Sequence, residues 1–143
     1  MNNHKQKKKI LMIDDDSIIR GLYRDYFARR EEYDFYLAID PEEGFKKAVE
    51  VMPDLIIMDL ILPKNLTAPL DIEEANKEFG FKLLERIRKD ERTANIPLVV
   101  FSNVDSDDDR AKTKELGAND YLVKTGAVPS QLMAKIESLL IKS

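Results

Sequence analysis

Short, uniformly apolar runs that end in acids recur along the chain and predict buried strands. One run, residues 55–58, follows Pro53 and ends at Asp59, and another, residues 10–13, ends at Asp14, Asp15 and Asp16. Such runs are typical of strands buried on both faces, as in a parallel sheet covered by helices. Three further strands are predicted over residues 34–38, 96–102 and 120–124.

Helical periodicity fills the segments between these strands. Asp40 and Pro41 have the form of a helix start, with a capping acid before proline at the first helical position. Further helices are predicted over residues 81–89 and 107–116, and from Pro129 onward. The first helix, which Asp16 or Ser17 can cap, has one apolar stripe made of Ile18, Ile19, Leu22, Tyr23, Tyr26 and Phe27.

The chain therefore alternates strand and helix five times, which favours a parallel sheet joined by right-handed crossovers. We predict an α/β fold: a flavodoxin-like, doubly wound five-stranded parallel sheet in the order 2-1-3-4-5, with helices on both faces. Its switch point lies between the first and third strands. Asp14 and Asp15 are then expected beside Asp59 at one edge of the sheet.

The connection after the third strand is long for a compact unit of this kind. We predict an insert at about residues 64–79, with a short helix over residues 72–77. The pattern Asp71-x-x-Glu74 has the form of a capping box for that helix. A partner-recognition role and a tolerated surface insertion both remain open, because loops accept added length at little cost.

Composition narrows the class of protein. The 143 residues are enough for one domain, which we place at residues 9–143, after a basic N-terminal tail at residues 1–8. The net charge is −4, and the basic residues are scattered, so direct nucleic-acid binding is not expected. No apolar run approaches the roughly 20 residues that span a bilayer. The absence of cysteine fits a cytoplasmic protein.

Four strand ends bring chemically useful side chains to one edge: Asp14 with Asp15, then Asp59, Ser102 and Lys124. Carboxylates at such close range repel one another unless a cation lies between them, which indicates a Mg²⁺ or Mn²⁺ site. A carboxylate such as Asp59 can attack phosphorus and form an acyl phosphate. Lys124 and Ser102 would then contact phosphoryl oxygens.

Each of these residues also has an ordinary structural interpretation. Asp16 is expected to be only a helix cap, and Asp14 and Asp15 alone could be acids that favour the helix dipole. Lys124 alone could be a solvated lysine at a strand end, and Ser102 alone could satisfy a local backbone group. The cation site is favoured because all of these residues meet at the same edge.

The chain resembles a response-regulator receiver domain of two-component signalling over residues 9–141. The resemblance rests on several motifs in order: Asp14-Asp15-Asp16, Asp59 with Pro63, Phe101-Ser102, Gly117-Ala118-Asn119-Asp120-Tyr121, and Lys124. It implies that Asp59 is the phosphoacceptor and that Lys124 contacts the phosphoryl group. It also implies that Ser102 and Tyr121 are the switch residues. The implied metal ligands are Asp14, Asp15, Asp59 and the backbone carbonyl of Ile61.

By this resemblance the protein is a stand-alone receiver and not an enzyme. A histidine kinase or phosphotransfer protein would phosphorylate Asp59 in a Mg²⁺-dependent step, and phosphorylation would switch docking to a downstream protein. A homodimer is possible on the same grounds, and no membrane partner is expected.

The sequence departs from the family at three places. Thr125 replaces the usual proline after Lys124, so we predict a trans bond between them, because a non-proline cis bond costs about 3 kcal/mol. Asn103 follows Ser102 where the family prefers a very small residue, so access to the phosphoryl group is expected to differ. The third departure is the insert at residues 64–79.

Two other functions fit parts of the pattern. One is a receiver-like binding module that works without phosphorylation, against which the intact set of site residues argues. The other is a Mg²⁺-dependent phosphohydrolase with an aspartyl nucleophile. Such an enzyme usually needs a general acid beside the nucleophile, and Leu60 and Ile61 supply none.

Overall fold

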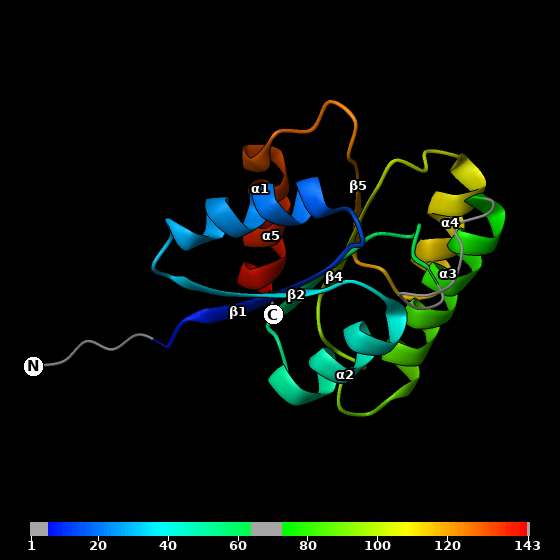
Figure 1. The fold of residues 1–143 in the computed structure, drawn as a ribbon. Coiled ribbons are helices and arrows are strands. Elements are labelled where there is room, and N and C mark those ends of the chain that lie inside the picture. The colour runs from blue at the N-terminus through cyan, green and yellow to red at the C-terminus, as the bar shows by residue number, and fades with distance from the viewer. Residues whose placement is uncertain (1–5, 64–72, 143) are drawn as a thin grey trace, which may run out of the picture.

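A five-stranded parallel sheet forms the centre of the protein (Figure 1). The computed structural model describes residues 6–63 and 73–142. The strand order is β2-β1-β3-β4-β5, so the predicted fold class and order are confirmed. The strands are β1 (Lys8–Ile13), β2 (Tyr33–Ala38), β3 (Leu55–Met58), β4 (Leu98–Ser102) and β5 (Asp120–Val123).

The register of the strands sets which residues meet at the carboxyl edge. Ile13 at the end of β1 pairs with Met58 at the end of β3. Ser102 at the end of β4 pairs with Val123 at the end of β5. The residues that follow these pairs are therefore neighbours, although they are far apart in the sequence.

Helices cover both faces of the sheet, with α1 and α5 on one face and α2, α3 and α4 on the other (Figure 1). Every residue of β3 is buried, as expected for a central strand between two helical layers. The helices are α1 (Ser17–Ala28), α2 (Pro41–Val51), α3 (Glu73–Lys89), α4 (Asp107–Glu115) and α5 (Pro129–Lys142).

Three helices begin at side-chain caps that the sequence supplies. Asp16 is the cap of α1 and accepts hydrogen bonds from the N–H groups of Ile18 and Ile19. Asp40 caps α2, with Pro41 as its first residue, and Ser106 caps α4. Asp16 is therefore the helix cap that the sequence favoured for it.

The apolar stripe predicted for α1 is only partly buried. Tyr23 and Phe27 are buried against β1 and β3, but the side chain of Ile18 is 79% exposed and that of Leu22 is 48% exposed. Ile18 and Leu22 lie at the N-terminal half of the helix, where neither belongs to the cluster that covers this face.

Helix α3 differs from the prediction of two separate helices, over residues 72–77 and 81–89. One helix runs from Glu73 to Lys89. It continues through Gly80, where the backbone of Leu60 packs so closely that a Cβ atom would lie 2.2 Å from the Leu60 carbonyl oxygen. The expected capping residue Asp71 and the first part of the insert, residues 64–72, lie outside the described residues.

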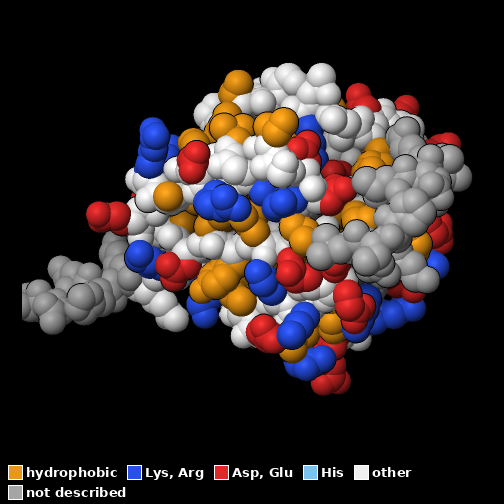
Figure 2. Space-filling view, viewed as in Figure 1, with side chains coloured by type: hydrophobic (Ala, Val, Ile, Leu, Met, Phe, Trp, Pro, Cys, Tyr) orange, Lys and Arg blue, Asp and Glu red, His pale blue; other side chains and the backbone are white. Residues whose placement is uncertain are grey.

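Charged side chains of both signs are mixed over the face in Figure 2, with hydrophobic side chains scattered between them. In the part of the chain that the structure describes, no helix is long and apolar enough to cross a membrane.

Candidate functional site

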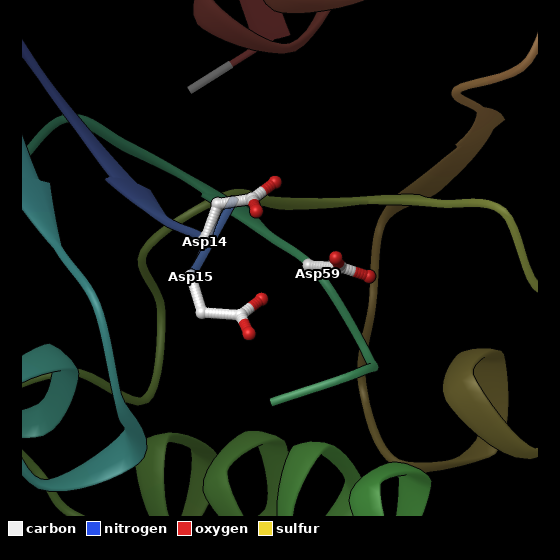
Figure 3. A group of neighbouring side chains, drawn as sticks. All are labelled: Asp14, Asp15 and Asp59. Carbon is white, nitrogen blue, oxygen red and sulfur yellow. The ribbon is translucent and has the colours of Figure 1, made fainter. Parts of the chain in front are cut away.

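Three carboxylates meet at the carboxyl edge of the sheet. Asp14 and Asp15 follow β1, and Asp59 follows β3. One oxygen from each lies within 4.8 Å of the others, and the three side chains extend into the same space (Figure 3). The structure therefore brings together the acids that the sequence placed at this edge. Oxygen ligands at this spacing are the donor set that a hard divalent cation prefers.

Lys124 reaches this group from the end of β5. Its Nζ atom lies 2.6 Å from Asp14 and 2.7 Å from Asp59. The lysine side chain is only 8% exposed, and those of the two acids are 1% and 7% exposed. These ion pairs are thus shielded from water. Charges interact more strongly in such a buried position than at an open surface.

Burial and mutual repulsion change the acidity of the cluster. Burial, together with the negative charge of Asp59, raises the pKa of Asp14 to about 6 despite the opposing effect of Lys124. The same two causes raise the pKa of Asp15. Burial acts to lower the pKa of Lys124, but the charges of Asp59 and Asp14 outweigh it and raise that pKa. The site therefore holds more negative charge than its one lysine neutralises.

Backbone hydrogen bonds orient the two buried acids. One oxygen of Asp14 accepts a hydrogen bond from the N–H of Asp16 at 2.9 Å. One oxygen of Asp59 accepts from the N–H of Ile61 at 3.1 Å. Each carboxylate thus uses one oxygen for the backbone and the other for Lys124.

Ser102 and Tyr121 are connected through Val104 in the loop after β4. Ser102 is fully buried, and its hydroxyl oxygen accepts a hydrogen bond from the N–H of Val104 at 3.3 Å. The Tyr121 hydroxyl donates to the carbonyl oxygen of Val104. Burial raises the pKa of Tyr121 to about 12, and the Arg110 guanidinium lies 4.7 Å from its ring centre. These contacts link the acidic edge to α4.

A cleft of about 370 Å³ opens above the acids. Larger hollows of about 520 and 510 Å³ lie between α2 and α3 and contain none of the clustered acids. The chemistry of its lining, and not its size, therefore makes the smaller cleft the candidate site. Its lining consists of Asp15, Asp16, Asp59, Ile61, Asn103 and Lys124.

Residues 10–137 match the family model described as the response regulator receiver domain. The chain belongs to this family. Members are signalling modules and not enzymes, which goes against the phosphohydrolase alternative. Receiver domains generally bind Mg²⁺ and interact with histidine kinases.

Curated relatives are named as transcriptional regulators. The chain is 36% identical over 132 residues to the DNA-binding dual master transcriptional regulator RpaA of a Synechocystis species. It is 33% identical over 136 residues to PhoP of Bacillus subtilis, the alkaline phosphatase synthesis transcriptional regulatory protein. These matches cover 92% and 95% of this chain but only 48% and 50% of the relatives. The receiver domain thus spans about half their length.

The names of these relatives bear on one expectation from the charge pattern. We expected no direct nucleic-acid partner, and DNA binding in the name of RpaA conflicts with that expectation. The argument from scattered basic residues applies only to the surface of the receiver domain. The DNA binding in the name of RpaA belongs to a protein about twice the length of this chain.

Solved structures share the fold. A CheY-like receiver domain protein from Methanospirillum hungatei has a TM-score of 0.78 at 24% identity, covering 96% of each chain. A LuxR-family response regulator from Aurantimonas has a TM-score of 0.76 at 27% identity, covering 96% of this chain and 87% of its own.

Two of the departures from the family meet in the structure. The described residues contain no cis peptide bond, so the bond from Lys124 to Thr125 is trans, as predicted. The Thr125 backbone N–H and hydroxyl both donate to Asn103 Oδ1, at 2.9 and 2.7 Å. The sequence pointed to Asn103 and Thr125 separately but not to their contact. The pairing of Ser102 with Val123 is the signal that could have joined them.

Proposed function

We propose that the receiver domain accepts a phosphoryl group on Asp59 from a phosphohistidine of a histidine kinase or phosphotransfer protein. An Asp59 oxygen forms the bond to phosphorus while the bond from phosphorus to the histidine nitrogen breaks. The electron pair stays on that nitrogen, which then takes up a proton. The observation that supports this proposal is the buried Lys124, held 2.6 Å from Asp14 and 2.7 Å from Asp59 at an edge rich in acids.

The carboxylates fit a divalent cation, because their negative charge exceeds that of the single lysine. Asp14, Asp15, Asp59 and the backbone carbonyl of Ile61 are the groups that would hold Mg²⁺, or Mn²⁺ in its place. A bound cation supplies positive charge for the oxygens of the transferred group.

Lys124 and Ser102 are suited to hold the phosphoryl group once it is transferred. Lys124 already pairs with Asp59, so its ammonium group lies where negative charge would build up. The Ser102 hydroxyl oxygen accepts from Val104 and so keeps its own hydrogen for a phosphoryl oxygen. Both residues would stabilise the product by charge-assisted hydrogen bonds.

Val104 provides the physical route from the site to the surface. Its N–H bonds to Ser102, and its carbonyl bonds to Tyr121. Movement of Ser102 toward a phosphoryl group therefore pulls on the segment that Tyr121 holds. The population of conformations at the face formed by α4, β5 and α5 shifts, and this changes docking to a downstream protein. Stand-alone action, homodimerisation and a cytoplasmic location stay predictions from the sequence.

Acetyl phosphate with Mg²⁺ tests the phosphorylation step. We expect the intact mass of the wild-type protein to rise by one phosphoryl group, and we expect no gain for Asp59→Asn. Asp54→Asn is the matched control. Asp54 lies at the other end of β3, away from the acidic edge, and its carboxylate accepts a hydrogen bond from the backbone N–H of Lys9. An unmodified wild-type protein would leave the phosphorylation-independent binding module as the better interpretation. Equal labelling of Asp59→Asn would contradict Asp59 as the acceptor, because another residue would then carry the phosphoryl group.

Mg²⁺ binding is expected to weaken as the pH falls through about 6. The raised pKa of Asp14 means that this carboxylate takes up a proton below that pH, and the proton competes with the cation. Between pH 7.5 and pH 5 we expect about a tenfold loss of affinity, measured by isothermal titration calorimetry. Asp14→Asn should bind Mg²⁺ more weakly and with a smaller pH dependence. An affinity that does not change with pH would contradict this assignment.

A further inference from the structure

Two hydrogen bonds join the residues that directly follow Ser102 and Lys124. Thr125 donates its backbone N–H and its hydroxyl to the same atom, Asn103 Oδ1, at 2.9 and 2.7 Å. We call this pair the Asn103–Thr125 clasp. It connects the loop after β4 to the loop after β5, next to Ser102 and Lys124, the residues proposed to hold the phosphoryl oxygens.

The clasp also fixes the orientation of the Asn103 side-chain amide, with its carbonyl oxygen toward Thr125. A backbone N–H only donates, so the atom of Asn103 that meets it must be the carbonyl oxygen. Asn103 lines the cleft above Asp59 together with Lys124 and Asp15. With its oxygen held by Thr125, the rest of the side chain is kept at the mouth of that cleft.

Both residues of the clasp are exposed, in contrast to the buried acids and Ser102 beneath them. Hydrogen bonds in such a position compete with water and are modest in net strength. They can open and close without the loss of any buried contact. The clasp thus has the properties of a movable cover and not of a core element.

We propose that the Asn103–Thr125 clasp limits the access of water to a phosphoryl group on Asp59 and so prolongs its lifetime. This inference rests on the proposed phosphorylation of Asp59. In hydrolysis, a water oxygen forms a bond to phosphorus and the bond from phosphorus to the Asp59 oxygen breaks. The carboxylate leaves, and the proton of the water passes to solvent. Asn103, held by Thr125, lines the cleft through which such a water would enter.

The lifetime of the phosphoryl group in matched variants tests this proposal. The protein is phosphorylated with acetyl phosphate and Mg²⁺, the donor is removed, and the decay of the phosphorylated mass is followed. Asn103→Ala removes the acceptor of both hydrogen bonds, and we expect hydrolysis about tenfold faster. Thr125→Val removes one donor, and we expect about a threefold increase. Thr125→Ser keeps both donors and should decay as the wild type does.

The double variant Asn103→Ala/Thr125→Val separates a clasp from two independent effects. If the two residues act as one unit, it decays no faster than Asn103→Ala alone. Normal phosphorylation with equal lifetimes in all variants would overturn the proposed role of the clasp and leave the proposed function intact. A faster decay in Asn103→Ala with no change in Thr125→Val would also overturn it. A wild-type protein that takes up no phosphoryl group would overturn the proposed function, and the clasp with it.

Discussion

Gly80→Ala is expected to destabilise the receiver domain by about 3 kcal/mol, although alanine favours helices more than glycine does. Gly80 lies inside α3, where a Cβ atom would come 2.2 Å from the carbonyl oxygen of Leu60 and 2.8 Å from its carbonyl carbon. These are backbone atoms and cannot rotate away, so α3 or the segment after β3 must move. Because Leu60 directly follows Asp59, the shift also disturbs the acidic site.

Gly21→Ala is the matched control for this variant. Gly21 also lies inside a helix, α1, but a Cβ atom there meets nothing within 4 Å. We expect it to stabilise the protein by about 0.5–1 kcal/mol. Urea unfolding followed by circular dichroism measures both variants. Similar changes in both glycine variants would show that helix propensity decides the outcome and that the contact with Leu60 does not.

The fold could be predicted from the sequence because its strongest signals are local. The runs at residues 10–13 and 55–58 are short and wholly apolar, which is typical of central strands of a covered sheet. The order of strands then brings Asp14, Asp15 and Asp59 together at their carboxyl ends, as observed. Here the chemistry of the site follows from the topology.

Features that depend on distant contacts could not be predicted in the same way. The need for glycine at position 80 inside α3 depends on Leu60, which is 20 positions earlier in the sequence. The exposure of Ile18 and Leu22 depends on how far the neighbouring elements extend over α1, which periodicity does not record. The pairing of Asn103 with Thr125 depends on the register of β4 and β5.

Lys124→Met is expected to lower the free energy of unfolding by about 3 kcal/mol at pH 7. The variant keeps most of the side-chain volume but leaves Asp14 and Asp59 buried, at 1% and 7% exposed, with no cation beside them. Lys135→Met is the matched control, because Lys135 pairs with Asp120 where both side chains are about one-third exposed. An exposed pair of that kind contributes less than about 1 kcal/mol.

The dependence of this loss on pH identifies its cause. A carboxyl with a raised pKa binds its proton more tightly in the folded protein than in the unfolded chain. The contribution of Asp14 to stability therefore increases as the pH falls from about 6 toward 3.8, its value without the surrounding protein. In Lys124→Met the lowering effect of the lysine is gone, so the pKa of Asp14 is higher still. The difference between variant and wild type should shrink at pH 5, where the acid is neutral.

At alkaline pH the difference in free energy of unfolding between Lys124→Met and the wild type should also shrink, because Lys124 loses its charge. The raised pKa of Lys124 means that its stabilising contribution is complete below 10.5 and is lost as the pH rises through the folded value. Millimolar Mg²⁺ should also recover part of the loss at pH 7, because a cation among the acids takes the place of the missing ammonium charge. A loss that stays the same at pH 5, at pH 7 and with Mg²⁺ would mean that Lys124 stabilises the protein by packing. Repulsion among the three carboxylates would then not be the force that this lysine opposes.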